Sequence, residues 1–205
     1  AERLCDNDPY QHPLYLGHMQ KPPHPAARLA YSLALWLNPN NHAFDGGRAS
    51  SLMEQEAVAE IAAMFGWKNF LVLLSSVGTM AYYEPLWIAP ELVFARHCGR
   101  AIAASAQAHY THARLSGVLG VPFQSVPTDR FGRMDMPALE DLLATGQIGT
   151  VVASLGTTGT GSVDPLDEIV ALRARHAFRL HVDAAYGGYF TLADNLAPAT
   201  RRAFD

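Results

Sequence analysis

Lysine and cysteine are both scarce in this chain of 205 residues. Lysine occurs only at Lys21 and Lys68, and arginine supplies the rest of the 15 basic side chains. The two cysteines, Cys5 and Cys98, lie far apart and form no CxxC pair. This usage is typical of a reducing cytoplasm and argues against a disulfide scaffold.

Several other features that would indicate a function are also missing. No apolar run approaches the ~18 residues of a membrane helix, and the N-terminal stretch "AERLCDNDPY" is too polar for a signal peptide. The net charge of -4 gives no basic surface for nucleic acid. Nine histidines are present, but without an HExxH motif or a Cys/His cluster, so we expect no metal site.

The remaining composition is that of a globular protein, with 49% hydrophobic and 17% charged residues. Residues 1–50 are predicted to form an N-terminal arm, in which an irregular Pro- and His-rich stretch precedes a helix over Pro25–Leu37. Residues 51–205 are predicted to form part of a large α/β domain, which begins with an amphipathic helix that ends at Gly66.

Short apolar runs alternate with helical patterns after that point, which predicts βαβ units and a mostly parallel sheet with helices on its faces. The expected strands cover residues 70–76, 101–105, 123–127, 149–156 and 178–183. Asp135 and Asp164 are expected to cap the helices that follow them, and Gly120 is expected to end another helix.

Four clusters rich in polar residues and glycine follow predicted strands: "SSVGTMA", "SAQAHYTH", "GTTGTGSVD" and "DAAYGGYF". Ligands of parallel sheets bind beyond the carboxyl ends of the strands, so all four clusters should face one crevice. In the first cluster, Ser76, Gly78 and Thr79 would offer N–H groups and hydroxyls at a helix N-terminus, which suits a phosphate. A plain capping turn is the alternative.

The second and third clusters add an imidazole and hydroxyl groups. His109 can stack on an aromatic ligand or act as an acid, or it can be a solvated loop histidine. His112 shares its helix face and has a proton-shuttling or a packing role. Thr157 and Thr158 place hydroxyls just past a strand, where an ordinary glycine-rich turn is the alternative.

The fourth cluster places Asp183 at the end of an apolar strand, where an ionised carboxylate needs a partner. A helix cap or a buried ion pair would explain it, but Ala184, Ala185, Gly187 and Gly188 favour a flat ligand close to the backbone. A protonated ring nitrogen would supply the charge. A phosphate anchor, a stacking imidazole and this carboxylate together indicate pyridoxal 5'-phosphate, whose protonated pyridine accepts electrons.

Four segments resemble the group II pyridoxal-phosphate-dependent amino acid decarboxylases, which include the aromatic amino acid, glutamate and tyrosine decarboxylases. The segments are "HVDAAYGG", "ASLGTTGTGSVDPLDEI", "AHYTHAR" and "HPLYLGHMQKPPHPAA". The resemblance implies an aspartate-aminotransferase-like fold (fold type I), a homodimer, and decarboxylation of an L-amino acid to an amine and CO2. The cysteine usage predicts a cytoplasmic protein.

The same resemblance implies individual roles. Asp183 and His109 are the implied catalytic residues, at the pyridine nitrogen and above the ring. The other implied cofactor contacts are Ser76, Gly78 and Thr79 at the phosphate, Ala185 under the ring, and Thr158 near the Asp183 carboxylate or the ring hydroxyl. Tyr15 and His18 match a segment that lines the substrate entrance.

The sequence departs from the family pattern in the segment expected to hold the phosphate. Val77 replaces a small or hydroxylic residue, and Tyr82 and Tyr83 stand where Asn and Leu are usual. Pro85 and Pro90 fall inside the expected helix, where each proline costs about 3 kcal/mol or introduces a kink. These departures affect the expected geometry of the phosphate cup.

The chemistry also needs a lysine that holds the cofactor as a Schiff base. Lys21 lies in an irregular segment, and Lys68 precedes the strand predicted at 70–76, at the wrong end of the sheet. We therefore expect the Schiff-base lysine beyond residue 205, in a C-terminal remainder of the enzyme. A carbon–carbon lyase on the same fold and a non-catalytic truncated homologue are the alternatives.

Overall fold

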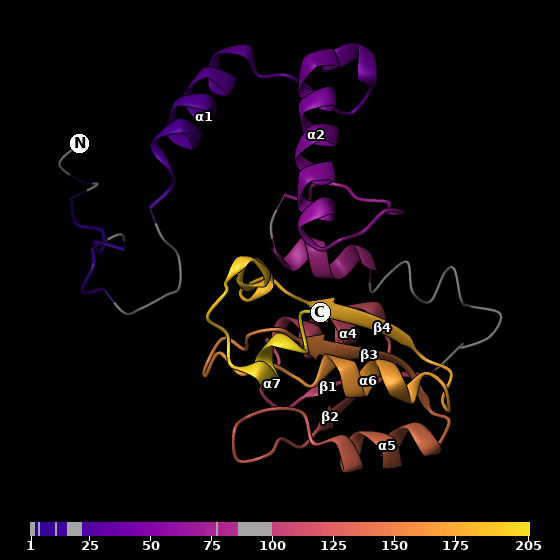
Figure 1. The fold of residues 1–205 in the computed structure, drawn as a ribbon. Helices are drawn as coiled ribbons and strands as arrows, with labels where there is room; N and C mark the ends of the chain where they lie inside the picture. Colours follow the sequence, from indigo (N-terminus) through magenta and orange to yellow (C-terminus); the bar gives the residue numbers. More distant parts are fainter. Residues whose placement is uncertain (1–2, 4, 11, 16–21, 77, 86–99) are drawn as a thin grey trace. The chain divides into compact units, whose positions relative to one another are not determined.

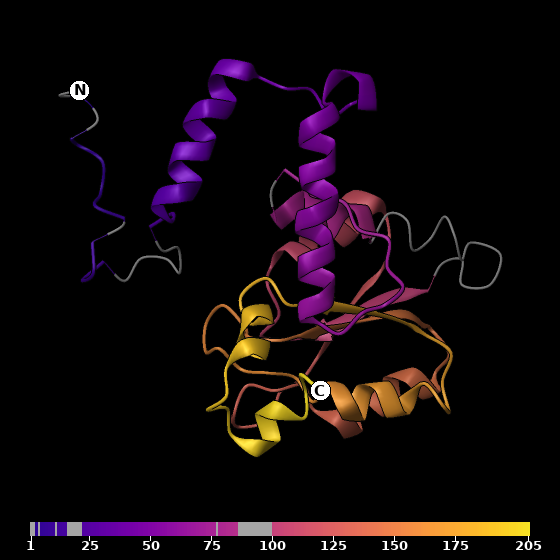
Figure 2. The same ribbon diagram turned by 45° about the horizontal axis from the view of Figure 1, so that its top comes forward.

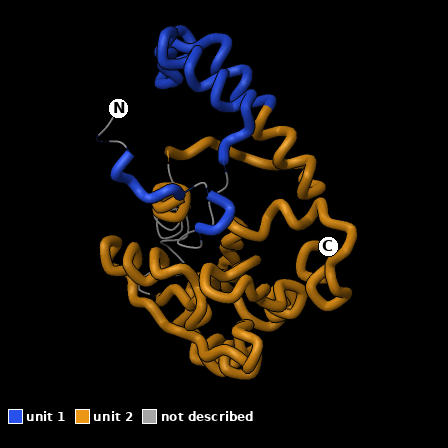
Figure 3. Tube along the Cα trace, turned by 90° about the vertical axis from the view of Figure 1, so that its left-hand side faces the viewer, with its two compact units in different colours: residues 1–56 blue, residues 57–205 orange. Residues whose placement is uncertain are grey.

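The computed structural model describes residues 3, 5–10, 12–15, 22–76, 78–85 and 100–205. It separates into two compact units, residues 1–56 and 57–205 (Figure 3). The division falls inside the helix α2 (Arg48–Met64), slightly beyond the boundary expected at residue 50.

Helix α1 (Pro25–Leu37) is the longest regular element that lies wholly in the first unit, and it confirms the predicted helix. Pro25 opens it, the His24 ring accepts the N–H of Ala26, and Asn38 ends it in a left-handed conformation with φ 42°. None of its residues is buried, although its sequence is largely apolar. Helix α1 therefore contributes no buried side chain to a core in the described part of this unit.

Four parallel strands form the sheet of the second unit, in the order β2-β1-β3-β4 (Figure 1). The strands are β1 (Ala101–Ser105), β2 (Phe123–Val126), β3 (Ile148–Ser154) and β4 (Arg179–Asp183). The helices of this unit include α4 (Thr111–Leu119), α5 (Met136–Ala144), α6 (Leu166–Leu172) and α7 (Pro198–Arg201), and a short 3-10 helix covers Gly188–Leu192. A second short 3-10 helix, Phe44–Gly46, belongs to the first unit. Four of the five predicted strands are confirmed.

Helices cover both faces of this sheet, as two views show (Figures 1 and 2). On one face, Leu139 of α5 and Ile169 of α6 pack with Val151 in the larger core cluster. On the other face, Leu115 of α4 packs with Val152, joined by residues of a helical segment at 78–85. Neighbouring strand residues thus point to opposite layers, as expected of a sheet buried on both faces.

The strand predicted at residues 70–76 is wrong. This segment forms no strand, and its leucines are exposed, Leu71 fully and Leu73 to 58%. Neither edge of the four-stranded sheet pairs with it within the described residues. A continuous apolar run fits a buried strand only when a partner edge is available, and this long-range condition is not written in the run itself.

One predicted helix cap is confirmed and another is wrong. Asp135 precedes α5, and its side chain accepts the N–H of Ala138 at 3.0 Å. Asp164 does not cap α6: it accepts the N–H of Met134 at 2.7 Å and of Ser154 at 2.8 Å. Those two N–H groups lie at the isolated β-bridge between Thr128 and Met134 and at the end of β3, and the fully buried carboxylate satisfies them in place of the helix.

The glycines that follow β4 are required by the packing of the chain itself. A Cβ atom on Gly187 would lie 1.9 Å from the carbonyl oxygen of Leu155. A Cβ atom on Gly188 would lie 3.2 Å from both Phe65 and Ala184. The expectation that a flat ligand explains these two glycines is therefore corrected.

We predict that Gly187→Ala lowers the free energy of unfolding of the complete protein by about 1–3 kcal/mol, the usual cost of overpacking. The added methyl group would meet backbone atoms, which cannot move aside as a flexible side chain can. Gly117→Ala in α4 is the matched control. Its Cβ atom meets open space, so we expect a gain of roughly 0.5–1 kcal/mol. Urea unfolding measures both, and a Gly187→Ala protein as stable as wild type would contradict this packing.

Candidate active site

The side chain of Asp183 is the centre of a polar cluster at the carboxyl end of β4. It is buried, and its Oδ1 accepts the hydroxyl of Tyr82 at 2.7 Å and the N–H of Ala185 at 3.1 Å. Its Oδ2 lies 3.1 Å from Nε2 of His112. An ionised carboxylate only accepts hydrogen bonds, so His112 is the donor in this contact.

Three separate elements bring these groups together. Asp183 is the last residue of β4 and lies opposite Ser154, the last residue of β3. His112 lies in the first turn of α4, which follows β1, and Tyr82 lies in the helical segment 78–85. Because the strands are parallel, their carboxyl ends share one edge, which is where the crevice was predicted.

The hydrogen bonds around Asp183 determine its charge. Burial raises the pKa of this carboxyl group, but the bonds from His112, Tyr82 and the Ala185 N–H outweigh burial, and the pKa falls below its ordinary value of 3.8. Burial, and then the bond to Asp183, raise the pKa of the Tyr82 phenol. At neutral pH the carboxylate is therefore ionised and the phenol is neutral.

Two histidine rings lie against this group. The His112 side chain is fully buried, with its ring centroid 4.7 Å from that of Tyr82 and 5.9 Å from that of His181. Burial lowers the pKa of His181 to about 4, so this ring is neutral at neutral pH. Within the described chain, Nδ1 of His112 and Nε2 of His181 are buried without a hydrogen-bond partner.

His109 lies in the same neighbourhood, just before α4. Its side chain is partly buried, and its ring centroid lies 6.2 Å from that of Tyr82. Its Nδ1 accepts a hydrogen bond from the N–H of Thr111 at 3.3 Å. The hydroxyls of Ser105 and Ser154, which end β1 and β3, are buried and have no partner among the described residues. Polar groups without partners thus gather at this edge of the sheet.

The other residues predicted to contact the phosphate or the ring do not belong to the Asp183 cluster itself. Ser76, Gly78 and Thr79 are exposed, and the last two begin the helical segment 78–85, one turn before Tyr82. Thr158 is exposed in the loop after β3, and no hydrogen bond described here joins it to Asp183. Its neighbour, Thr157, is buried and accepts the N–H of Ser162 at 3.0 Å.

Several other residues singled out in the sequence lie in the first unit or outside the described residues. Tyr15 belongs to the first unit, and His18, Lys21, Val77, Pro90 and Cys98 lie outside the described residues. Pro85 is itself helical, and its carbonyl accepts a bond from Arg179 at 2.7 Å. The helix therefore continues up to Pro85.

Lys68 lines a surface pocket with Asn69, Phe70 and Leu71. Because residues 70–76 form no strand, the expectation that Lys68 occupies the wrong end of a strand loses its basis. None of the contacts in the described part of the chain links Lys68 to Asp183.

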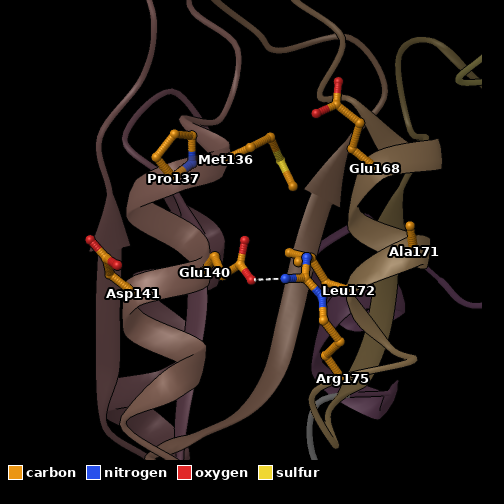
Figure 4. Close-up of a pocket in the computed structure, with 8 residues that line it drawn as sticks. All are labelled: Met136, Pro137, Glu140, Asp141, Glu168, Ala171, Leu172 and Arg175. Carbon is orange, nitrogen blue, oxygen red and sulfur yellow. Dashed lines mark ion pairs between the residues drawn. The ribbon is translucent and has the colours of Figure 1, made fainter.

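Another pocket, of about 500 Å³, lies between α5 and α6 on the other face of the sheet (Figure 4). Glu140 and Arg175 form an ion pair in it, and Met136 and Leu172 supply apolar surface. This pocket is separate from the Asp183 cluster, which lies beside α4. No group of three or more metal-binding side chains, and no helix long and apolar enough to cross a membrane, occurs among the described residues.

Comparison with known proteins connects this cluster to a family. A family model described as "Pyridoxal-dependent decarboxylase conserved domain" matches residues 98–203, a stretch that includes β1 to β4 and Asp183. This chain belongs to that family. Its cofactor is pyridoxal phosphate, as the sequence predicted.

Named relatives support the assignment. A probable L-aspartate decarboxylase of Halobacterium salinarum is 33% identical over 174 residues, which cover 85% of this chain and 48% of that protein. An L-tyrosine decarboxylase of Levilactobacillus brevis is 30% identical, with 85% of this chain and 38% of the relative covered. The chain thus spans about half or less of the length of these relatives.

Solved structures confirm the fold. Mouse CSAD has a TM-score of 0.84 and 25% identity, with 94% of this chain and 45% of that chain covered. The glutamate decarboxylase domain of a Vibrio parahaemolyticus protein has a TM-score of 0.80, and the match covers 94% of this chain and 48% of that chain. The predicted α/β, fold type I architecture is therefore confirmed.

The residues of the cluster fit the cofactor of this family. A carboxylate offers about four lone-pair positions, and three donors occupy the Asp183 side chain. One position is left for the N–H of a protonated ring. His109 is only partly buried and Ala185 is exposed, so both have surface available to a flat ligand.

Sequence reasoning missed the parts played by Tyr82 and His181 and left His112 between two roles. Two patterns point to the histidines: His181 and Asp183 are two apart on one strand and share a face, and His112 lies one turn beyond His109. In the sequence, Tyr82 stands out only as a departure from the family pattern. Its contact spans 101 positions of sequence, which no local pattern encodes.

The lowered pKa of Asp183 predicts a pH dependence of stability. A carboxyl group whose pKa is lower in the folded protein stabilises the fold above its ordinary value of 3.8 and loses this contribution as the pH falls toward the folded value. We expect the stability difference between wild type and Asp183→Asn to shrink as the pH is lowered from about 6 to about 3.

Urea unfolding of the complete protein at several pH values measures this difference. Exposed Asp141→Asn in α5 is the control, and its difference from wild type should change much less over the same range. A difference for Asp183→Asn that stays constant with pH would show that the three donors do not favour the ionised carboxylate.

Proposed function

We propose that the complete protein is a pyridoxal-phosphate-dependent carboxy-lyase, which converts an L-amino acid to the amine and CO2. The buried carboxylate of Asp183, ionised and with one lone-pair position open at the carboxyl end of β4, is the observation that carries the proposal. Its place inside the matched stretch, 98–203, supports it. The decarboxylases of aspartate and tyrosine among the relatives agree with this reaction class.

When bound, the cofactor supplies an electron-accepting ring, into which the electron pair of the breaking carbon–carboxylate bond is delocalised. Asp183 would keep the proton on the ring nitrogen and so maintain that capacity. His109 would lie over one face of the ring and Ala185 under the other. We assign Thr158 a position near the ring hydroxyl or the Asp183 carboxylate.

The phosphate would lie at Ser76, Gly78 and Thr79. These residues are exposed, and helical N–H groups at the start of 78–85 have no intrahelical partner in the first turn, which suits an anion. Tyr82 connects this helix to Asp183, so one short element would link the phosphate end of the cofactor to its ring nitrogen. Tyr15 and His18 are proposed to line the substrate entrance.

We further propose that the lysine that holds the cofactor lies in the part of the enzyme that this chain does not span. The chain covers 48% of the aspartate decarboxylase and 38% of the tyrosine decarboxylase described above, which leaves room for it. The only described lysine, Lys68, has no contact with the cluster. The 205-residue stretch alone is then expected to be inactive.

A homodimer in the cytoplasm completes the proposal. The exposed apolar side chains of α1 support dimerisation: Leu33 is 58% exposed, Leu35 66% and Trp36 89%. A helix with this surface favours association with another apolar surface. The two cysteines, distant in sequence, suit a reducing compartment.

The function is tested on the complete protein supplied with pyridoxal phosphate and candidate amino acids, with CO2 release as the assay. We expect Asp183→Asn to lower the rate roughly 30- to 1000-fold, which corresponds to about 2–4 kcal/mol, because the amide cannot hold a protonated ring nitrogen. Asp141→Asn should be as active as wild type.

Borohydride reduction should attach a pyridoxyl group to a lysine other than Lys21 and Lys68. Near-normal turnover by Asp183→Asn would contradict the role of this carboxylate. Cleavage of a carbon–carbon bond without CO2 release would favour the lyase alternative. Complete absence of cofactor binding would favour a non-catalytic homologue.

For the dimer, we expect sedimentation of the complete protein to give twice the monomer mass. Replacing Trp36 by Glu places a charge on the apolar surface of α1 and should weaken the association. Glu60→Gln on the exposed side of α2 is a control that should leave the mass unchanged. A stable wild-type monomer would contradict the proposed dimer.

A further inference from the structure

The burial of His112 is not explained by packing alone. Its side chain is fully buried, it donates from Nε2 to Asp183, and its Nδ1 has no partner among the described residues. A buried polar atom without a partner lowers stability, so an apolar residue here would be the simpler solution for the fold. What His112 contributes is one hydrogen bond to the Asp183 carboxylate.

The donors around this carboxylate are divided between its two oxygens. Tyr82 and the Ala185 N–H occupy Oδ1, at 2.7 and 3.1 Å. His112 occupies one position on Oδ2. A carboxylate held by both oxygens cannot rotate freely, and the open position is the second lone pair of Oδ2.

The two side-chain donors are themselves fixed. The ring centroids of Tyr82 and His112 lie 4.7 Å apart. The His181 ring packs edge-on against both, with centroid distances of 6.1 Å to Tyr82 and 5.9 Å to His112. The backbone of His112 is held as well, because the hydroxyl of Ser116 donates to the carbonyl of His112 at 2.9 Å. A turn of either ring away from Asp183 would break these ring contacts.

We propose that His112 and Tyr82 are positioning residues, which hold the Asp183 carboxylate by both oxygens and leave a single acceptor position for the N–H of a protonated ring. This inference rests on the proposed function, because it takes the cofactor ring as the ligand of Asp183. Neither residue touches the cofactor in this role: both act through Asp183. Where a residue orients the side chain that binds a metal ion, its mutation typically changes affinity or activity by about 10–100-fold, and we expect an effect of similar size here.

Three variants of the complete protein test the proposal. His112→Phe keeps a ring but removes the donor, His112→Gln restores an N–H donor in a similar place, and Tyr82→Phe removes one hydroxyl with almost no change of volume. His176→Phe, a partly buried histidine near Glu140 beside α6, is the matched control.

The first measurement uses the cofactor-free protein with 13C-labelled aspartate, in which NMR follows the carboxyl group of Asp183 with pH. Losing a hydrogen bond to the ionised form raises the pKa, so we expect a higher pKa in His112→Phe and in Tyr82→Phe than in wild type. His112→Gln should return the pKa toward the wild-type value, and His176→Phe should not change it.

The second measurement is the dissociation constant of pyridoxal phosphate. We expect roughly tenfold weaker binding in His112→Phe and in Tyr82→Phe, with rescue in His112→Gln. If His112→Phe does not fold, Tyr82→Phe decides the outcome alone. Unchanged Asp183 titration and unchanged cofactor binding in the variants would overturn this inference and leave the proposed function intact, whereas a wild-type protein that does not bind pyridoxal phosphate would overturn the proposed function.

Discussion

An ionised carboxylate buried at the end of a strand requires hydrogen-bond donors, and this requirement connects the elements on one face of the sheet. Asp183 receives them from three places: the helical segment 78–85 through Tyr82, helix α4 through His112, and the backbone just after β4 through Ala185. Each donor favours the charged form, so the group keeps its charge in spite of burial. The charge is then available to a ligand.

The opposite face supplies the rigidity that such a site needs. There α5 and α6 pack on the sheet through a continuous apolar cluster, of which Leu139, Val151 and Ile169 are fully buried members. Asp164 adds a second buried carboxylate, which binds the N–H of Ser154 at the end of β3. Since Ser154 lies opposite Asp183 in the sheet, this bond helps fix the edge at which the cluster forms.

Much of the fold follows from local patterns. The apolar runs of β1 and β3 are buried along their whole length, and Asp135 caps α5 as its position before Met136 suggests. The place of Asp183 at a strand end could also be predicted, because strand period and strand end are both visible in the sequence.

The failures of prediction concern contacts between distant segments. The run at 70–76 lacks a partner edge, and Asp164 satisfies distant N–H groups rather than its own helix. Gly187 is small because the carbonyl of Leu155 approaches it, a contact that no local pattern encodes. The hydroxyl of Tyr82 reaches Asp183 across the chain, so its part in the site becomes visible only in the fold.

We propose that Asp183 binds the protonated ring nitrogen of the cofactor while Tyr82 and His112 continue to hold the carboxylate. A crystal structure of the complete protein with pyridoxal phosphate would locate the ring nitrogen relative to this carboxylate. We expect a contact of about 2.7–2.9 Å between the ring nitrogen and Oδ2, with both side-chain donors in place. A ring nitrogen bound elsewhere, with Asp183 bonded to protein donors alone, would contradict it.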